Sequence, residues 1–334
     1  MSLFDSTSAA VRARRSGVDA WRQALLEQQA DCWERVREHG DQRREHLSDR
    51  ATYVLADAIQ WLAELPANSI HAVVTDPPYG LFEYEEKNHA KLRAGRGGVW
   101  RIPPSFDGAK RKPLPRFTVL SQEEVTALYS FFGALAYGLT RALVPGGHIF
   151  IASNPLLSTM TFHAFQRAGL EKRGEVIRLV QTLRGGDRPK GAEAEFPDVS
   201  MMARSCWEPW GVFRKPFEGT AAENLRKWGT GGLRRISEDE PFKDVIACSP
   251  TRGAEKDIAP HPSLKPQRFM RQVVRAVLPL GLGIVYDPFA GSSSTLAAAQ
   301  ALGYTSIGTD RDVQYYAMAK KAFPALAKLP MSER

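Results

Sequence analysis

Short apolar runs alternate along the chain with segments whose hydrophobic residues recur every three or four positions. The runs are typical of buried strands, and they lie at residues 53–56, 72–74, 148–151 and 284–286. A further strand is predicted at residues 305–309. The amphipathic segments predict helices, and the clearest has an apolar face formed by Val125, Leu128, Phe132, Leu135, Leu139 and Leu143. Strands that alternate with helices in this way form parallel sheets, so the pattern predicts an α/β fold.

The first 50 residues predict a helical extension that lies outside the α/β core. Four apolar residues are spaced to fall on one side of a helix, with charged residues between them: Trp21, Leu25, Cys32 and Val36. Arg12, Arg14 and Arg15 suggest a basic DNA-binding arm, but nine arginines and nine acidic residues cancel over the segment. We therefore expect a solvated extension that packs on the core or on a second subunit.

Two further stretches interrupt the pattern of strands and helices. Residues 81–117 are rich in glycine and proline and carry nine basic against four acidic side chains. This composition favours a loop that closes over DNA phosphates, with an ordinary surface loop as the alternative. Residues 171–259 mix short predicted strands with isolated aromatic and basic side chains, which favours a DNA target-recognition insertion. A structural insertion whose tryptophans are core residues is the alternative.

Composition narrows the class of protein. The chain has 334 residues, of which 43% are hydrophobic and 25% charged, as is typical of a globular protein. Its net charge of +8 fits a polyanionic partner. Cys32, Cys206 and Cys248 lack metal-ligand or disulfide spacing, and no apolar run approaches the ~18 residues of a membrane span. We therefore expect a cytoplasmic protein without a metal site.

The segment Thr75-Asp76-Pro77-Pro78-Tyr79-Gly80 follows the apolar run at 72–74, so it lies where a parallel strand ends. Open α/β sheets bind their ligands at this edge. A carboxylate at Asp76 accepts hydrogen bonds from an amino group, and Tyr79 offers a ring on which a flat base stacks. The two prolines between them fix the backbone. These features favour a site for the exocyclic amino group of a base, while a simple strand-ending turn is the alternative.

A second candidate site follows the predicted strand at 284–286. The strand runs into Asp287-Pro288-Phe289-Ala290-Gly291-Ser292, a turn of small residues, and the next strand ends in Asp310. Small residues let a ligand approach the backbone, and a distal acid accepts hydrogen bonds from ribose hydroxyls. The turn lacks the GxGxxG spacing that cradles a pyrophosphate, and its acid repels phosphate but attracts an ammonium group. S-adenosylmethionine therefore fits this site better than a nicotinamide dinucleotide.

Together these motifs resemble those of the amino-group DNA methyltransferases, in the class whose base-binding motif precedes the cofactor motif. The resemblance rests on Asp76-Pro77-Pro78-Tyr79, on His261-Pro262-x-x-Lys265-Pro266 and on the turn that begins at Asp287. The segment from Trp207 to Asn224 is similar to phage-type and restriction-associated members. The resemblance implies a Rossmann-like sheet with helices on both faces, S-adenosylmethionine as the cofactor, and base flipping in double-stranded DNA.

The resemblance also implies roles for individual residues. The catalytic residues, which hold the target base, are Asp76, Pro77, Pro78 and Tyr79. The cofactor site is formed by Asp57, His261, Lys265, Asp287, Pro288, Phe289, Ala290, Gly291, Ser292 and Asp310. From its residues alone, an aspartate at the position of Asp57 is more often a helix cap than a ligand. The family usually has glycine where this chain has Ser293, and a hydroxymethyl group there would crowd the cofactor.

The same resemblance predicts the domain organisation and the acceptor. It divides the chain into an extension at 1–50, a catalytic half at 51–170, a target-recognition insertion at 171–259 and a cofactor-binding half at 260–334. Aspartate at the head of the motif is more typical of adenine-N6 enzymes, so adenine is the expected acceptor and cytosine N4 the alternative. RNA or protein-amide methylation, and a DNA-binding module with a decayed cofactor site, are weaker alternatives. A homodimer and a cognate restriction endonuclease are partners that the resemblance allows.

Overall fold

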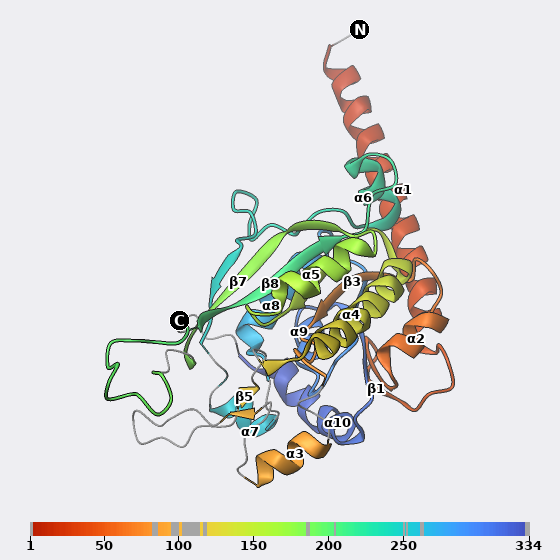
Figure 1. Cartoon of the computed structure of the whole chain (residues 1–334). Coiled ribbons are helices and arrows are strands. Elements are labelled where there is room, and N and C mark those ends of the chain that lie inside the picture. Colours follow the sequence, from red (N-terminus) through yellow and green to blue (C-terminus); the bar gives the residue numbers. More distant parts are fainter. Residues whose placement is uncertain are drawn as a thin grey trace.

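A single large sheet forms the centre of the protein (Figure 1). The computed structural model describes residues 3–81, 86–94, 100–101, 114–115, 119–184, 188–203, 205–249, 251, 253–260 and 264–330. In these residues the sheet has nine strands, namely β1 (Arg44–Ser48), β2 (Ala51–Leu55), β3 (Ile70–Thr75), β6 (Leu143–Ala152), β7 (Glu171–Arg184), β8 (Ser205–Arg214), β9 (Val245–Ala247), β10 (Ile284–Asp287) and β11 (Thr305–Asp310). β4 (Trp100–Arg101) and β5 (Leu114–Pro115) form a separate antiparallel pair.

The strand order is β1-β2-β11-β10-β3-β6-β8-β7-β9. The five strands from β2 to β6 in this order are parallel, whereas β8 runs antiparallel to both β6 and β7. The chain leaves β3 towards β6 on one side and leaves β10 towards β11 on the other. β3 and β10 are therefore the neighbouring strands at which the strand order reverses. Open α/β sheets bind ligands at such a switch point, beside the carboxyl ends of the strands.

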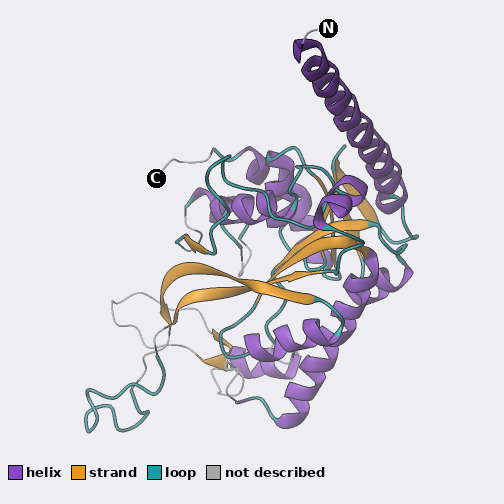
Figure 2. Cartoon of the chain, turned by 90° about the horizontal axis from the view of Figure 1, so that it is seen from above, coloured by secondary structure: helices purple, strands orange, loops and turns teal. Residues whose placement is uncertain are grey.

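Helices cover both faces of the sheet, as the view from above shows (Figure 2). One face carries the C-terminal part of α1 (Leu3–Arg37) together with α2 (Ala58–Glu64), α4 (Gln122–Ala142) and α5 (Ser158–Arg167). The other face carries α8 (Gln267–Val277), α9 (Ser294–Ala301) and α10 (Val313–Lys328). The remaining helices are α3 (Glu86–Arg93), α6 (Ala221–Trp228) and α7 (Ala254–Ile258). The predicted α/β fold with helices on both faces is confirmed.

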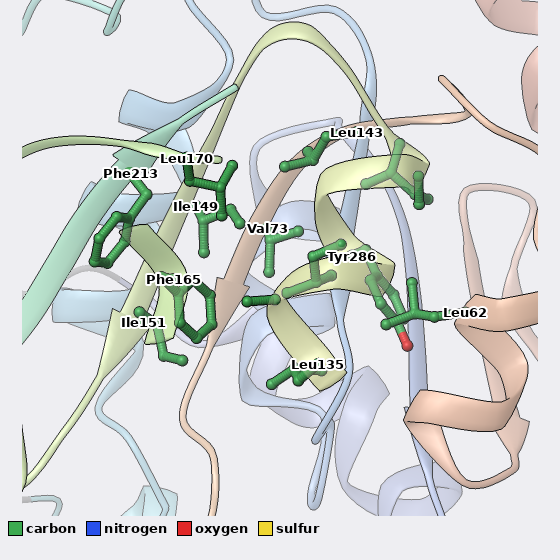
Figure 3. Packing of buried hydrophobic residues seen from close by; sticks show 14 of the residues in the cluster. Leu62, Val73, Leu135, Leu143, Ile149, Ile151, Phe165, Leu170, Phe213 and Tyr286 are labelled. Carbon is green, nitrogen blue, oxygen red and sulfur yellow. The ribbon is translucent and has the colours of Figure 1, made fainter. Parts of the chain in front are cut away.

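The two faces of β3 build two separate hydrophobic cores. Because successive side chains of a strand point to opposite faces, Val73 packs with Ile149 and Leu135 on the α4 side (Figure 3). Ala72 and Val74 pack on the α8 side. All six residues of β3 are buried, which is why the strand reads as a continuous apolar run in the sequence. Asp76 follows directly after this buried strand, so the position of its loop depends on the packing of β3.

The N-terminal prediction was correct for the helix and wrong for the residues after it. α1 ends at Arg37, and Leu25, Cys32 and Val36 are buried by it as predicted. Residues Arg44–Ser48 instead form β1, an edge strand antiparallel to β2. The strand was missed because its sequence, Arg-Glu-His-Leu-Ser, has no apolar run and its side chains are half-buried or exposed. No helix in the described ranges has the length and apolarity that crossing a membrane requires.

Residues 171–259 contribute to the central sheet. β7 and β8 pair along most of their length, and β8 also pairs with β6 from His148 to Ala152. Trp210 on β8 is fully buried and contacts the Phe269 ring of α8, with 5.0 Å between ring centroids. The first part of this region therefore extends the sheet beyond β6, and it brings β8 side chains close to the end of β3.

Candidate functional site

The two sequence motifs meet at the switch point of the sheet. Thr75 is the last residue of β3 and Asp287 is the last residue of β10, its neighbour. The hydroxyl of Thr75 donates a hydrogen bond to Oδ1 of Asp287 at 2.7 Å. The loop that carries Asp76 and the turn that carries Phe289 therefore leave the sheet side by side. This arrangement brings a base-binding motif and a cofactor motif to one edge.

Asp287 organises the turn that follows it. Besides Thr75, its carboxylate accepts hydrogen bonds from the Thr295 hydroxyl at 2.6 Å and from the backbone N–H of Phe289 at 3.1 Å. The side chain is 4% exposed, and burial raises the pKa of Asp287 to about 6, although these donors oppose the shift. With three donors already bound, Asp287 ties β10 to β3 and to the start of α9.

The turn at 288–292 lies directly on β11. The backbone N–H of Ala290 donates to the carbonyl of Thr309 at 2.9 Å, and that of Gly291 donates to Oδ2 of Asp310 at 3.0 Å. Gly308 makes this approach feasible, since a Cβ there would lie 2.6 Å from Cβ of Ala290. Pro288, Ala290, Gly291 and Ser292 are buried, whereas the Phe289 ring is only half-buried. The structure therefore presents the Phe289 ring, backed by Phe131, at the edge of the sheet.

Two acids lie at the carboxyl ends of the neighbouring strands β2 and β11: Asp310 ends β11, and Asp57 follows β2 by two residues. Asp310 accepts from two backbone N–H groups, those of Gly291 and Asp312, and remains partly exposed. Burial raises the pKa of Asp310, while these two hydrogen bonds lower it. Each of its oxygens keeps a lone pair for a further donor. Asp57 caps α2, because its carboxylate accepts from the N–H groups of Ile59 and Gln60.

Asp76 and Tyr79 form one hydrogen-bonded unit at the mouth of β3. The phenol of Tyr79 donates to Oδ1 of Asp76 at 2.9 Å. The ammonium group of Lys265 lies 2.8 Å from Oδ2 of Asp76 and 5.7 Å from the centroid of the Tyr79 ring. Pro77 is buried and Pro78 half-buried between the two polar residues. The structure therefore brings Lys265, predicted in the cofactor set, into contact with the loop whose residues are predicted to be catalytic.

A buried charge network that the sequence did not reveal completes this unit. Glu208 on β8 lies 3.2 Å from the Lys265 ammonium and 3.5 Å from the Arg178 guanidinium. Its other oxygen accepts a hydrogen bond from the indole N–H of Trp210 at 2.7 Å. Glu208 lies in the segment that resembles phage-type enzymes, but no sequence pattern placed that segment next to Asp76. Only the pairing of β8 with β6 brings it there.

Burial and mutual contacts shift the pKa values of this network in different directions. Burial raises the pKa of Asp76, and the nearby Glu208 raises it further, against the opposing effect of Lys265. Burial alone would lower the pKa of Lys265, but Asp76 and Glu208 raise it. Burial would raise the pKa of Glu208, yet Lys265 and Arg178 lower it. Glu208 and Lys265 are therefore held in their charged forms, and Asp76 is the group most readily protonated.

Ser293 adopts a backbone conformation that favours glycine. Its φ is 71° and its ψ is 26°, and its side chain makes no capping hydrogen bond to α9. The residue is fully buried, and its Oγ has no hydrogen-bond partner among the described residues. Ser293, which stands where the resembling family usually has glycine, therefore lies at a strained point of the backbone.

Two of the sequence predictions lie outside the described residues. His261 is one of them, although its motif partner Lys265 is well placed. The basic loop at 81–117 is the other, apart from α3, β4, β5 and a few adjoining residues. The proposed closure of this loop over DNA phosphates stays a prediction.

Comparison with known proteins shows which proteins this chain is similar to. Residues 207–321 match the N6/N4 methyltransferase family model, described as DNA methylase. The chain is 25% identical over 288 residues to the type II methyltransferase M.HindIII of Haemophilus influenzae, a match that covers 79% of this chain and 92% of that protein. It is 31% identical to the type II methyltransferase M2.DpnII of Streptococcus pneumoniae over 93 residues, which cover 28% of this chain and 34% of the relative.

Solved structures of similar fold are also DNA methyltransferases. The cytosine-N4-specific PvuII DNA methyltransferase has a TM-score of 0.53 at 15% identity, covering 85% of this chain and 88% of its own. The M1.HpyAVI complex with S-adenosylmethionine has a TM-score of 0.51 at 15% identity, covering 81% and 98%. The predicted resemblance to the amino-group DNA methyltransferases is confirmed, while these low identities speak for the fold alone.

Proposed function

We propose that this chain, a DNA methyltransferase of the N6-adenine/N4-cytosine family, transfers a methyl group from S-adenosylmethionine to N6 of adenine in double-stranded DNA. The observation that carries the proposal is the hydrogen bond between Thr75 and Asp287, which sets the two motifs side by side. The type II relatives support DNA as the substrate and a place in a restriction-modification system. The aspartate at position 76 favours adenine as the acceptor.

The residues of the Asp287 turn suit S-adenosylmethionine, which supplies a methyl group on a sulfonium centre when bound. The half-buried Phe289 ring and the close-packed backbone at Ala290 and Gly291 offer a flat apolar surface. Asp310 keeps lone pairs for ribose hydroxyls at the end of β11. Asp57, which follows the neighbouring strand β2, lies at the same edge, but its carboxylate already caps α2.

The catalytic loop is suited to hold a flipped base by its amino group. Flipping costs a few kcal/mol of lost stacking and pairing, and stacking on Tyr79 offsets roughly 1–3 kcal/mol of that cost. The Asp76 carboxylate and the Pro77 carbonyl accept the two amino hydrogens. These bonds favour a tetrahedral amino nitrogen, whose lone pair would form the new bond to the methyl carbon of bound S-adenosylmethionine. The carbon–sulfur bond would break with its electron pair left on sulfur, and the nitrogen would release one proton to water. Catalysis by this loop is mainly positioning.

The chemistry of the site does not depend on which base carries the amino group, so the acceptor needs a direct test. Cytosine N4 is the second candidate, since a neighbour of the same fold is specific for it. The experiment is expression in a host without DNA methylation, followed by digestion of its DNA to nucleosides and mass spectrometry. N6-methyladenine is the expected product. Detection of N4-methylcytosine would make cytosine the acceptor. The absence of both modified bases would refute the proposed function.

A further inference from the structure

Lys265 lies between two carboxylates that come from different parts of the fold. Its ammonium group is 2.8 Å from Oδ2 of Asp76 and 3.2 Å from Oε2 of Glu208. The phenol oxygen of Tyr79 lies 3.4 Å away. Asp76 belongs to the loop after β3, whereas Glu208 belongs to β8. The ammonium group of Lys265 is therefore within reach of two carboxylates and can pair with either.

The two carboxylates differ in how firmly they are held. Glu208 is anchored on both oxygens, by the Trp210 indole at 2.7 Å on one and by Arg178 at 3.5 Å on the other. Arg178 is itself fixed, because its guanidinium donates to the carbonyl of Ser249 and lies over the Phe269 ring. Among the described residues, the Asp76 carboxylate is bound by the Tyr79 hydroxyl and the Lys265 ammonium group. Glu208 is therefore a rigid acceptor and Asp76 an adjustable one.

The proposed function creates a conflict for Asp76. To hold the target amino group with its full negative charge, Asp76 must be released from the cation that neutralises it. In the structure Oδ1 accepts from Tyr79 and Oδ2 pairs with Lys265, so both oxygens are engaged. A buried lysine cannot leave this contact without another anion, since an unpaired buried charge is costly. Glu208 is the anion that the fold supplies.

We propose that Glu208 is a positioning residue that takes over Lys265 when Asp76 turns to the amino group of the target base. This inference rests on the proposed function and adds a role for a residue that does not itself touch the base. In the free protein Lys265 neutralises Asp76. In the complex Lys265 pairs with Glu208, and Asp76 keeps its full charge for the amino hydrogens. No proton or bond is exchanged in this step, only the partner of one cation.

The first test is Glu208→Gln, which keeps the shape of the side chain and an oxygen for Trp210 but removes the charge. Lys265 then has Asp76 as its sole carboxylate partner in the network and competes with the base for it. The kcat of DNA methylation is expected to fall roughly 10–100-fold, with the KM values for DNA and S-adenosylmethionine nearly unchanged. Because Glu208 raises the pKa of Asp76, the acid limb of the kcat profile should also move to lower pH.

The decisive test is the double variant Glu208→Gln/Lys265→Met. If the defect of Glu208→Gln arises because Lys265 holds Asp76, removing Lys265 as well should raise kcat at least about fivefold above that of Glu208→Gln, at a pH where Asp76 is ionised. A merely structural Glu208 would give losses that add or worsen. An unchanged kcat in Glu208→Gln, or a double variant no faster than Glu208→Gln, overturns the proposal.

Glu171→Gln is the matched control, because Glu171 is also a carboxylate of the β7–β8 pair bound to an arginine. The Arg214 guanidinium donates to it at 2.9 Å, away from the Asp76 loop. Its kcat and pH profile should equal those of the wild type. If Glu208→Gln does not fold, the single variant Lys265→Met is the test. The fall of its kcat at low pH should move to higher pH, and its kcat on the pH plateau should stay within about tenfold of the wild type. A larger loss of kcat on the plateau overturns the proposal.

The assay separates this inference from the function on which it rests. The wild type is measured on the same unmethylated DNA in the same experiment. A wild type that binds S-adenosylmethionine but methylates no base refutes the proposed function. A wild type that methylates DNA, with an unaffected Glu208→Gln variant, refutes only the role of Glu208.

Discussion

The hydroxyl of Thr75 and the carboxylate of Asp287 are joined by a 2.7 Å hydrogen bond across the two strands at the switch point. Both groups are buried, so the bond is part of the core as well as of the site. Asp287 has a pKa raised to about 6 by burial, above that of a solvated carboxyl group. The native state therefore binds more protons at this residue than the unfolded state between the two pKa values.

A pH dependence of stability follows from this raised pKa. The contribution of Asp287 to the free energy of unfolding is largest at low pH and is lost as pH rises through about 6. Asn at this position cannot ionise, so the stability advantage of the wild type over Asp287→Asn should shrink between pH 5 and pH 7. Urea unfolding of both proteins across this range measures it. An advantage that grows with pH would contradict the assignment.

Asp76→Ala is expected to abolish methyl transfer while leaving cofactor binding largely intact. The variant loses the acceptor for the amino hydrogens, whereas the Phe289 turn is untouched. Single-turnover methylation and isothermal titration with S-adenosylmethionine measure the two properties separately. In the wild type, activity should fall as pH drops through the pKa of Asp76, which burial and Glu208 raise above the usual range. Undiminished turnover in Asp76→Ala would remove this residue from the mechanism.

Tyr79 should contribute through its ring more than through its hydroxyl. Tyr79→Phe keeps the stacking surface and is expected to retain much of the activity, while Tyr79→Ala retains little. The phenol hydrogen bond lowers the pKa of Asp76. Its removal in Tyr79→Phe should therefore move the acid limb of the kcat profile to higher pH, opposite to the shift expected for Glu208→Gln. Equal losses in both Tyr79 variants would instead make the hydrogen bond the main contribution.

Asp310→Ala is expected to weaken S-adenosylmethionine binding without removing the ability to flip a base. A hydrogen bond to a charged group contributes about 1.5–3 kcal/mol, so the Kd should rise roughly 10–150-fold. Part of the loss comes from the turn, because the N–H of Gly291 also loses its acceptor. Isothermal titration measures the Kd, and Asp312→Ala, at the adjoining helix cap, is the control that should leave it unchanged. Equal affinity in wild type and Asp310→Ala would exclude the ribose role.

Most of the core could be predicted from the sequence because its strands are buried on both faces and its helices on one. β3 and β10 contain apolar runs, and α4 begins at a capping box formed by Ser121 and Glu124, a pattern that can be read from the sequence. The loop after β3 and the turn after β10 were located for the same reason, since each follows such a run.

The charge network could not be predicted, because it depends on strand pairing between distant segments. β8 carries polar and aromatic residues at its start, and it pairs with β6 on one side and with β7 on the other. Nothing in the spacing of Arg178, Glu208 and Lys265 indicates that they share one buried site. β1 was missed because an edge strand needs no apolar run.

Ser293→Gly is expected to stabilise the protein by about 1 kcal/mol and raise its Tm by about 2 °C. Serine at a φ of 71° carries strain that glycine avoids, and the change also removes a buried hydroxyl that lacks a partner among the described residues. The greater flexibility of glycine in the unfolded chain offsets part of this gain. Ser292→Gly is the matched control: Ser292 lacks a positive φ, so this change should lower the stability. Thermal unfolding distinguishes the two, and an equal or lower Tm in Ser293→Gly would show that the serine at this turn is not strained.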